Sequence, residues 1–188
     1  EYLDFIAQNP TVTRNAFQRI YDMIMSYGTE EFIDAKKRLI RYKFFSDMSF
    51  DQNDAIFGLE IPLMRLVNFF KAAAQGYGTE KRVLLLHGPV GSSKSTIVRR
   101  LKKGLEHYSH TDDGKLYTFE WRLPKELNHI SGGQDVFADP MNEDPLRLVP
   151  EEWRKSVFEE LGLYKNSPYP VQFRGDLNPS CRFIFKEL

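Results

Sequence analysis

The stretch from Gly88 to Ser95 has the residue types and spacing of a phosphate-binding loop. It reads Gly-Pro-Val-Gly-Ser-Ser-Lys-Ser and follows the apolar run Val83–Leu86. Glycines let a backbone turn tightly enough for several N–H groups to converge on one anion. A lysine and a hydroxyl side chain after that turn supply a charge for the phosphates and a ligand for Mg²⁺. The stretch therefore predicts a P-loop that binds a nucleoside triphosphate with Mg²⁺.

Each position of the loop takes a role from the pattern G-x-x-x-x-G-K-[ST]. Lys94 is the catalytic candidate, because it would neutralise charge that develops on the transferring phosphoryl group. Ser95 is the metal candidate, and Thr96 is one residue out of register for that role. We expect the ATP contacts to come from nine residues: Gly88, Pro89, Val90, Gly91, Ser92, Ser93, Lys94, Ser95 and Thr96.

Ser93 departs from the pattern, because it stands where the second glycine is expected. If that position needs a left-handed backbone, a residue with a side chain costs roughly 1–2 kcal/mol. Contacts with a ligand can offset a cost of that size. We interpret Ser93 as a tolerated variant. The alternative is an ordinary strand, turn and helix in which Lys-Ser occurs by chance.

The segments around the loop favour the P-loop. The run before it predicts a buried strand, and the residues after it repeat at helical spacing. A further helix is expected over 58–75, upstream of this strand, and a second strand over 116–121. The helix after the loop then lies between two strands, which favours a βαβ crossover and a largely parallel sheet. The apolar stripe of the helix after the loop consists of Ile97, Val98, Leu101 and Leu105.

The rest of the chain is expected to be mainly helical. Helices are expected over 9–27, 30–42 and 150–161 and from residue 178 onward, with Trp153 facing inward. Irregular stretches are expected over 44–54 and 124–150. We place a boundary after residue 54, which gives a helical N-terminal segment over 1–54 and an ATP-binding domain over 55–188.

Composition limits the possible functions. Among 188 residues, 26 basic side chains balance 26 acidic ones, so no overall charge favours nucleic acid or an anionic membrane. A single cysteine excludes an internal disulfide and is typical of a reducing, cytoplasmic location. No apolar run has the length of a membrane span. Because the chain starts at Glu1 and not at methionine, we expect it to be part of a longer protein.

Several segments resemble the PrkA family of bacterial serine protein kinases. They are spread over most of the chain in the order expected of the N-terminal half of that family. The segments are Tyr21–Ile24, Gly58–Glu60, Phe69–Gly76, Gly88–Thr96, Asn142–Leu146 and Gly175–Leu177.

The resemblance implies an α/β fold with the partial parallel-sheet core of an AAA-type P-loop NTPase, preceded by a helical extension. It also implies ATP and Mg²⁺ as cofactors, a protein substrate and a possible homo-oligomer. The acidic Walker B strand of the family would lie further downstream, since no apolar run here ends in Asp-Glu. We therefore expect these 188 residues to bind ATP without appreciable hydrolysis.

Two classes of function remain open for the parent protein. The first is an enzyme, either a serine protein kinase or an AAA-type ATPase. The second is an interaction module that changes its contacts when ATP binds. The chain lacks G-x-G-x-x-G, His-Arg-Asp and Asp-Phe-Gly, so kinase activity rests on the resemblance alone.

Other residues of potential function fit ordinary structural roles better. The basic cluster Arg99, Arg100, Lys102 and Lys103 is interpreted as the solvated face of a helix. His107 and His110 lack partners for a zinc site. Cys181 has no base beside it in the sequence, so it is interpreted as a core or surface thiol.

Overall fold

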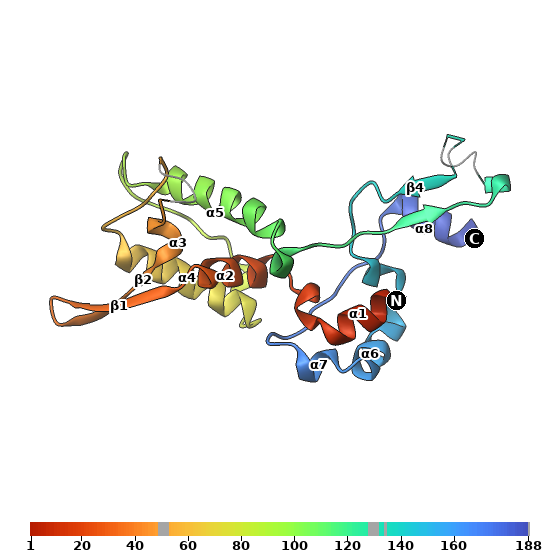
Figure 1. Ribbon diagram of the computed structural model, residues 1–188, viewed down its shortest axis with the longest axis horizontal. Coiled ribbons are helices and arrows are strands. Elements are labelled where there is room, and N and C mark those ends of the chain that lie inside the picture. Colours follow the sequence, from red (N-terminus) through yellow and green to blue (C-terminus); the bar gives the residue numbers. More distant parts are fainter. Residues whose placement is uncertain (49–52, 128–131, 134, 188) are drawn as a thin grey trace. The chain divides into compact units, whose positions relative to one another are not determined.

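The computed structural model describes residues 1–48, 53–127, 132–133 and 135–187. Parts of the two predicted irregular stretches, 49–52 and 128–131 with 134, lie outside the described residues, as does residue 188. The main helices and strands, all but β3 labelled in Figure 1, are α1 (Tyr2–Gln8), α2 (Ala16–Ser26), β1 (Thr29–Asp34), β2 (Lys37–Tyr42), α3 (Lys43–Ser46), α4 (Glu60–Ala74), α5 (Lys94–Ser109), β3 (Glu120–Arg122), β4 (Val136–Ala138), α6 (Glu151–Glu160), α7 (Leu163–Asn166) and α8 (Pro179–Glu187).

Contacts divide the chain into two compact units. One, called the P-loop unit here, contains Thr11–Lys115 together with the short segment Ser167–Val171. The other, called the second unit, contains Glu1–Pro10, Leu116–Asn166 and Gln172–Leu188.

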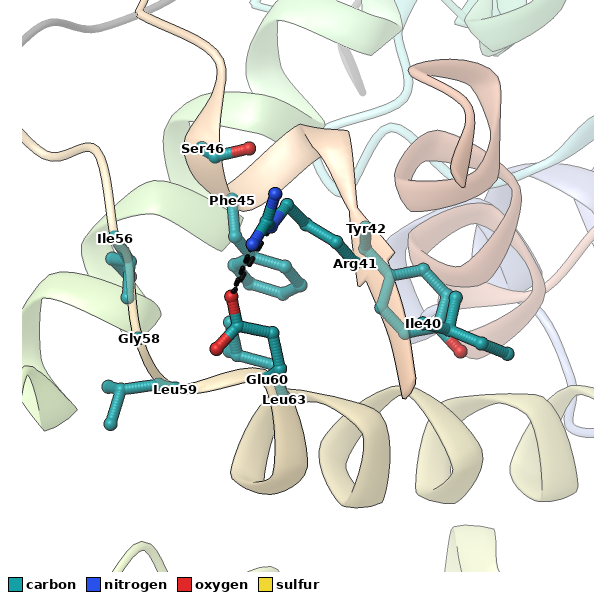
Figure 2. Close-up of a pocket in the computed structure, with 10 residues that line it drawn as sticks. All are labelled: Ile40, Arg41, Tyr42, Phe45, Ser46, Ile56, Gly58, Leu59, Glu60 and Leu63. Atoms are coloured by element: carbon teal, nitrogen blue, oxygen red, sulfur yellow. Dashed lines mark hydrogen bonds and ion pairs between the residues drawn. The ribbon is translucent and has the colours of Figure 1, made fainter. Parts of the chain in front are cut away.

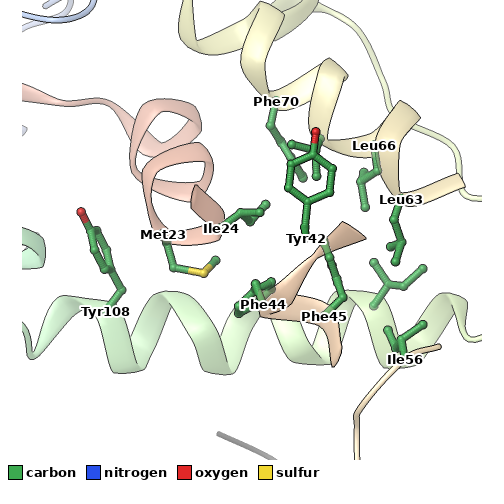
Figure 3. Packing of buried hydrophobic residues seen from close by; sticks show 12 residues of the cluster. Met23, Ile24, Tyr42, Phe44, Phe45, Ile56, Leu63, Leu66, Phe70 and Tyr108 are labelled. Atoms are coloured by element: carbon green, nitrogen blue, oxygen red, sulfur yellow. The ribbon is translucent and has the colours of Figure 1, made fainter. Parts of the chain in front are cut away.

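The core of the P-loop unit lies where three helices meet the end of β2. Helix α2 packs against both α4 and α5, and β2 packs against α4. Figure 3 shows aromatic side chains from the β2–α3 junction inserted between the helices. The buried cluster consists of Met23, Ile24, Tyr42, Phe44, Phe45, Ile56, Leu63, Leu66, Val67, Phe70, Ile97 and Tyr108.

Helix α5, which follows the P-loop, lies close against this core. Gly104 allows the approach, because a Cβ there would lie 2.5 Å from Cε2 of Phe44, which is fully buried. Arg100 is also fully buried, and its Nε donates to the carbonyl of Phe44 at 2.7 Å. The prediction that Arg100 belongs to a solvated face is therefore wrong: its guanidinium donates to backbone carbonyls of α3 and of Asp47, the residue after it.

The predicted helix over 30–42 is wrong, because those residues form the antiparallel hairpin β1–β2. Phe32 pairs with Leu39 across the hairpin, a spacing of seven that also fits two turns of a helix. The turn residues Ala35 and Lys36 have positive φ angles of 44° and 64° without a glycine or asparagine between the strands. The usual sequence signal of a hairpin turn is therefore missing.

Predicted helices elsewhere are largely confirmed. Helices α2, α4, α6 and α8 fall within the predicted ranges, and a short 3₁₀ turn over Pro10–Thr13 precedes α2. The orientation predicted for α6 is wrong at Trp153, which is 65% exposed. Arg154 and Phe158 provide the buried face of α6 in its place.

The expected parallel sheet is not found among the described residues. Their two sheets are the antiparallel pairs β1–β2 and β3–β4. The prediction of a buried strand over Val83–Leu86 is wrong here, because the run forms no strand and Val83 and Leu85 are exposed. The strand predicted over 116–121 is limited to β3. A strand joins a parallel sheet only by pairing with a neighbouring strand, and the described part of the chain brings none beside Val83–Leu86.

The second unit has its own small core, which includes Ile6, Leu146, Phe158, Leu163 and Ile184. Cys181 is buried there, and its thiol lies 3.3 Å from a carboxylate oxygen of Asp139. Burial raises the pKa of this thiol, which fits a structural cysteine and not a nucleophile. No helix in the described ranges has the length and apolar character needed to cross a membrane.

Candidate functional site

The P-loop residues form a tight turn that ends at the first residue of α5. Gly91 has a φ of 82°, and Ser93 has φ 58° and ψ 15°, so both occupy the left-handed region. The first backbone bond of α5 runs from the amide of Ile97 to the carbonyl of Ser93 at 2.8 Å. The amides of Lys94, Ser95 and Thr96 precede that bond, and they lie at the positive end of a helix of 16 residues.

The Lys94 ammonium group folds back over the loop. Its Nζ donates to the carbonyls of Gly88 and Pro89 at 2.8 and 2.6 Å, and to Oγ of Ser92 at 2.9 Å. The three donors of the ammonium are thus directed into the turn. The positive charge lies within the loop, as a phosphate site requires.

Close packing explains the first glycine of the loop. A Cβ on Gly88 would lie 2.8 Å from Oγ of Ser92, and that hydroxyl also bonds the Pro89 carbonyl at 2.8 Å. A side chain at Gly88 would therefore displace the Ser92 hydroxyl from this position. Val90 lies at the tip and is fully exposed.

A cavity of about 550 Å³ adjoins the loop on the α4 side. Its size lies in the range usual for small-molecule sites, and its lining mixes apolar side chains with a few charged ones. Sequence reasoning missed the wall that α4 provides, because only tertiary packing brings that helix beside the loop. The lining residues on this wall are Leu59, Pro62, Arg65, Leu66 and Phe69.

A second cavity, of about 520 Å³, lies along α5 on the other side of Lys94. Ser95 lines it together with Val98, Arg99 and Lys102. Lys94 and Leu86 border both cavities, so the lysine separates two open spaces. The candidate metal residue, Ser95, thus faces open space next to the candidate phosphate residue.

A third pocket, between β2, α3 and the start of α4, is too small to hold a nucleotide (Figure 2). Its volume is about 10 Å³, which is room for a single water at most. Arg41 bridges it through an ion pair with Glu60, with Nη2 3.1 Å from Oε1. This pocket is part of the packing around α4.

Two of the basic candidates on α5 share a structural partner. Both Arg99 and Lys103 form ion pairs with the carboxylate of Asp54. Nη2 of Arg99 lies 2.7 Å from Oδ1, and Nζ of Lys103 lies 3.3 Å from Oδ2. The hydrogen bond from Arg99 holds the pKa of Asp54 at about 2. Within the described residues, no cluster of three or more histidine, cysteine or acidic side chains could hold a metal ion.

A comparison of the sequence with known protein families identifies one family. The family model for the PrkA AAA domain matches residues 1–188. The chain therefore belongs to the PrkA AAA domain family, which implies the P-loop NTPase fold and the binding of a nucleotide.

Two curated relatives carry different names. The chain is 37% identical over 180 residues to a protein of Bacillus subtilis (strain 168) named ATP-dependent protease PrkA, and this match covers 95% of this chain and 23% of that protein. It is 30% identical over 105 residues to serine/threonine kinase YeaG of Escherichia coli (strain K12), and this second match covers 54% of this chain and 16% of that protein. The chain thus spans less than a quarter of the length of either relative. No solved structure matches it.

Proposed function

We propose that this chain is the ATP·Mg²⁺-binding module of a protein that couples ATP to the phosphorylation of protein serine. The observation that supports the proposal most directly is the position of the Lys94 ammonium inside the turn of the loop, bonded to Gly88 and Pro89. The cavity beside the loop adds space for the nucleoside. The family relationship adds the expectation of a nucleotide.

The loop residues contact different parts of the nucleotide according to their chemistry. Pro89 has no amide hydrogen, so the backbone donors for phosphate come from the residues after it, from Val90 to Thr96. Lys94 releases its bond to Ser92 Oγ, which can rotate away, and donates to the β- and γ-phosphate oxygens. Ser95 provides the hydroxyl ligand for Mg²⁺.

The same proposal includes the finer features of the fold and the setting. In the parent protein, Val83–Leu86 is the P-loop strand of a parallel-sheet core, and residues 55–188 belong to the ATP-binding domain that follows the helical segment 1–54. The parent acts on a protein substrate in the cytoplasm, as a possible homo-oligomer, without a membrane or nucleic-acid partner. Each of these statements stays a prediction.

An AAA-type ATPase without kinase activity is the second candidate. The name of the Bacillus subtilis relative, an ATP-dependent protease, favours it, and so does the lack of protein-kinase signatures in this sequence. A full-length parent that transfers the γ-phosphate to a protein serine is a kinase, and one that releases only free phosphate is an ATPase. A parent that does neither is a nucleotide-gated interaction module.

Calorimetric titration of the chain with ATP, with and without Mg²⁺, tests the binding itself. Lys94→Ala is expected to weaken ATP binding by about 2 kcal/mol or more, roughly thirtyfold, because a charge-assisted contact with phosphate is lost. Lys71→Ala is the matched control. Lys71 is an exposed lysine in the last turn of α4, outside the lining of both cavities. Equal affinities of the two variants would contradict the proposed role of Lys94.

A further inference from the structure

The segment Ser167–Val171 leaves the second unit to lie on the P-loop unit. The residues before and after it both belong to the second unit, whereas its own contacts place it with the P-loop unit. Its sequence is Ser-Pro-Tyr-Pro-Val. Its two prolines lack amide hydrogens, so the segment cannot be held by a regular ladder of backbone hydrogen bonds.

Two side chains of α2 hold this segment. The hydroxyl of Tyr169 donates to Asp22. Nε2 of Gln18 donates to the carbonyl of Pro170 at 3.1 Å. Gln18 and Asp22 are four residues apart, so they lie on the same face of α2. Burial, followed by the bond to Asp22, raises the pKa of the Tyr169 hydroxyl, which therefore stays protonated and able to donate.

The same two residues of α2 reach the helices on either side of the P-loop. Gln18, which is only 3% exposed, also donates to the carbonyl of Ala74 at the end of α4. Asp22 accepts from Arg14, whose guanidinium in turn donates to the hydroxyl of Tyr108 in α5 at 3.1 Å. One chain of polar contacts thus joins the segment to the helix before the loop and to the helix after it.

We infer that Ser167–Val171 is a releasable strap that clamps α2 and, through it, the far ends of α4 and α5. The bonds of Tyr169 and Pro170 to α2 are made to two side chains, so loss of the Tyr169 hydroxyl alone loosens the segment. Once it is free, Gln18 and Asp22 lose a partner each, and the ends of α4 and α5 become more mobile. A consequence that rests on the proposed function is that strap release weakens ATP binding, since both helices position the loop.

Hydrogen exchange of the chain, measured by mass spectrometry without nucleotide, tests the strap independently of ATP. Tyr169→Phe removes only the hydroxyl that Asp22 accepts. It is expected to speed exchange about fivefold in α2 and in the end of α5, which would open more often. Tyr164→Phe is the matched control, because Tyr164 is 48% exposed and the change keeps the ring that contacts Phe158. Equal exchange rates in the two variants would overturn the inference that Ser167–Val171 acts as a strap.

Titration of the same variants with ATP tests the consequence. Tyr169→Phe is expected to weaken ATP binding about threefold while Tyr164→Phe leaves it unchanged. Faster exchange with unchanged ATP affinity would overturn the link between the strap and the loop. If the unaltered chain fails to bind ATP, the proposed function fails, and the exchange experiment still decides whether the strap exists.

Discussion

Ser93 holds a left-handed backbone conformation at the entrance to α5. The pattern asks for glycine there, and the observed φ of 58° is one that glycine adopts without strain. The serine therefore carries a conformational cost that the loop tolerates. This could be anticipated because a P-loop is a contiguous motif, in which the neighbours along the chain fix the geometry.

Replacing Ser93 by glycine is expected to stabilise the protein. Relief of roughly 1–2 kcal/mol of left-handed strain exceeds the entropic cost of a glycine, roughly 0.5–1 kcal/mol. The free energy of unfolding should rise by about 0.5–1 kcal/mol in urea denaturation. Ser92→Gly is the matched control, since Ser92 is not among the residues with positive φ and should lose stability. A loss in both variants would contradict the strain at Ser93.

Asp54 makes stability depend on pH at the acidic end. Its carboxylate accepts from Arg99 and Lys103, and its pKa is lowered from 3.8 to about 2. A lowered pKa in the folded state means that the contribution is complete above about pH 4 and is lost as the pH falls toward 2. Urea midpoints of the native chain should fall more steeply over this range than those of Asp54→Asn. Parallel curves would show that the ion pairs contribute nothing.

At the scale of elements, periodic helices could be predicted and the hairpin could not. The apolar stripe of α4 has the spacing of a helix and not of a strand, whereas the apolar residues of β1–β2 have a spacing that fits either a strand or a helix. The burial of Arg100 escapes local patterns for a related reason. Its partners are backbone carbonyls of Phe44 and Asp47, which are more than fifty residues away and invisible to local patterns.

The contact between α5 and α3 predicts a clear cost for a small substitution. Gly104→Ala places a methyl group against the buried ring of Phe44, and overpacking costs about 1–3 kcal/mol. This outweighs the gain in helix propensity, about 1 kcal/mol, so the free energy of unfolding should fall. Adding Phe44→Leu frees space, and the double variant should lose less than the two single losses combined. If the two losses in the free energy of unfolding simply add, the methyl group does not press against Phe44, and the prediction is contradicted.

At the scale of the whole molecule, the candidate site combines a contiguous sequence motif with residues that only tertiary packing brings together. The loop residues and the start of α5 follow from one contiguous motif. The cavity wall on α4 and the strap follow from packing between distant segments, which one sequence does not reveal. Within the described residues no strand lies beside Val83–Leu86, although the family implies a P-loop fold.

This arrangement predicts binding without turnover by the 188-residue chain. Hydrolysis needs an acidic group that orients the attacking water and helps to hold Mg²⁺, and the sequence has no apolar run ending in Asp-Glu. Phosphate release from ATP should match that of Lys94→Ala, which serves as the inactive reference. A rate clearly above this reference would mean that acidic residues of this chain complete the site.

A crystal structure of the chain with Mg²⁺ and a non-hydrolysable ATP analogue tests the central claim most directly. We predict phosphate oxygens within about 3.2 Å of Lys94 Nζ and of the amides that open α5. The metal ion should lie beside Oγ of Ser95. A fully occupied triphosphate bound away from Gly88–Thr96 would contradict the account.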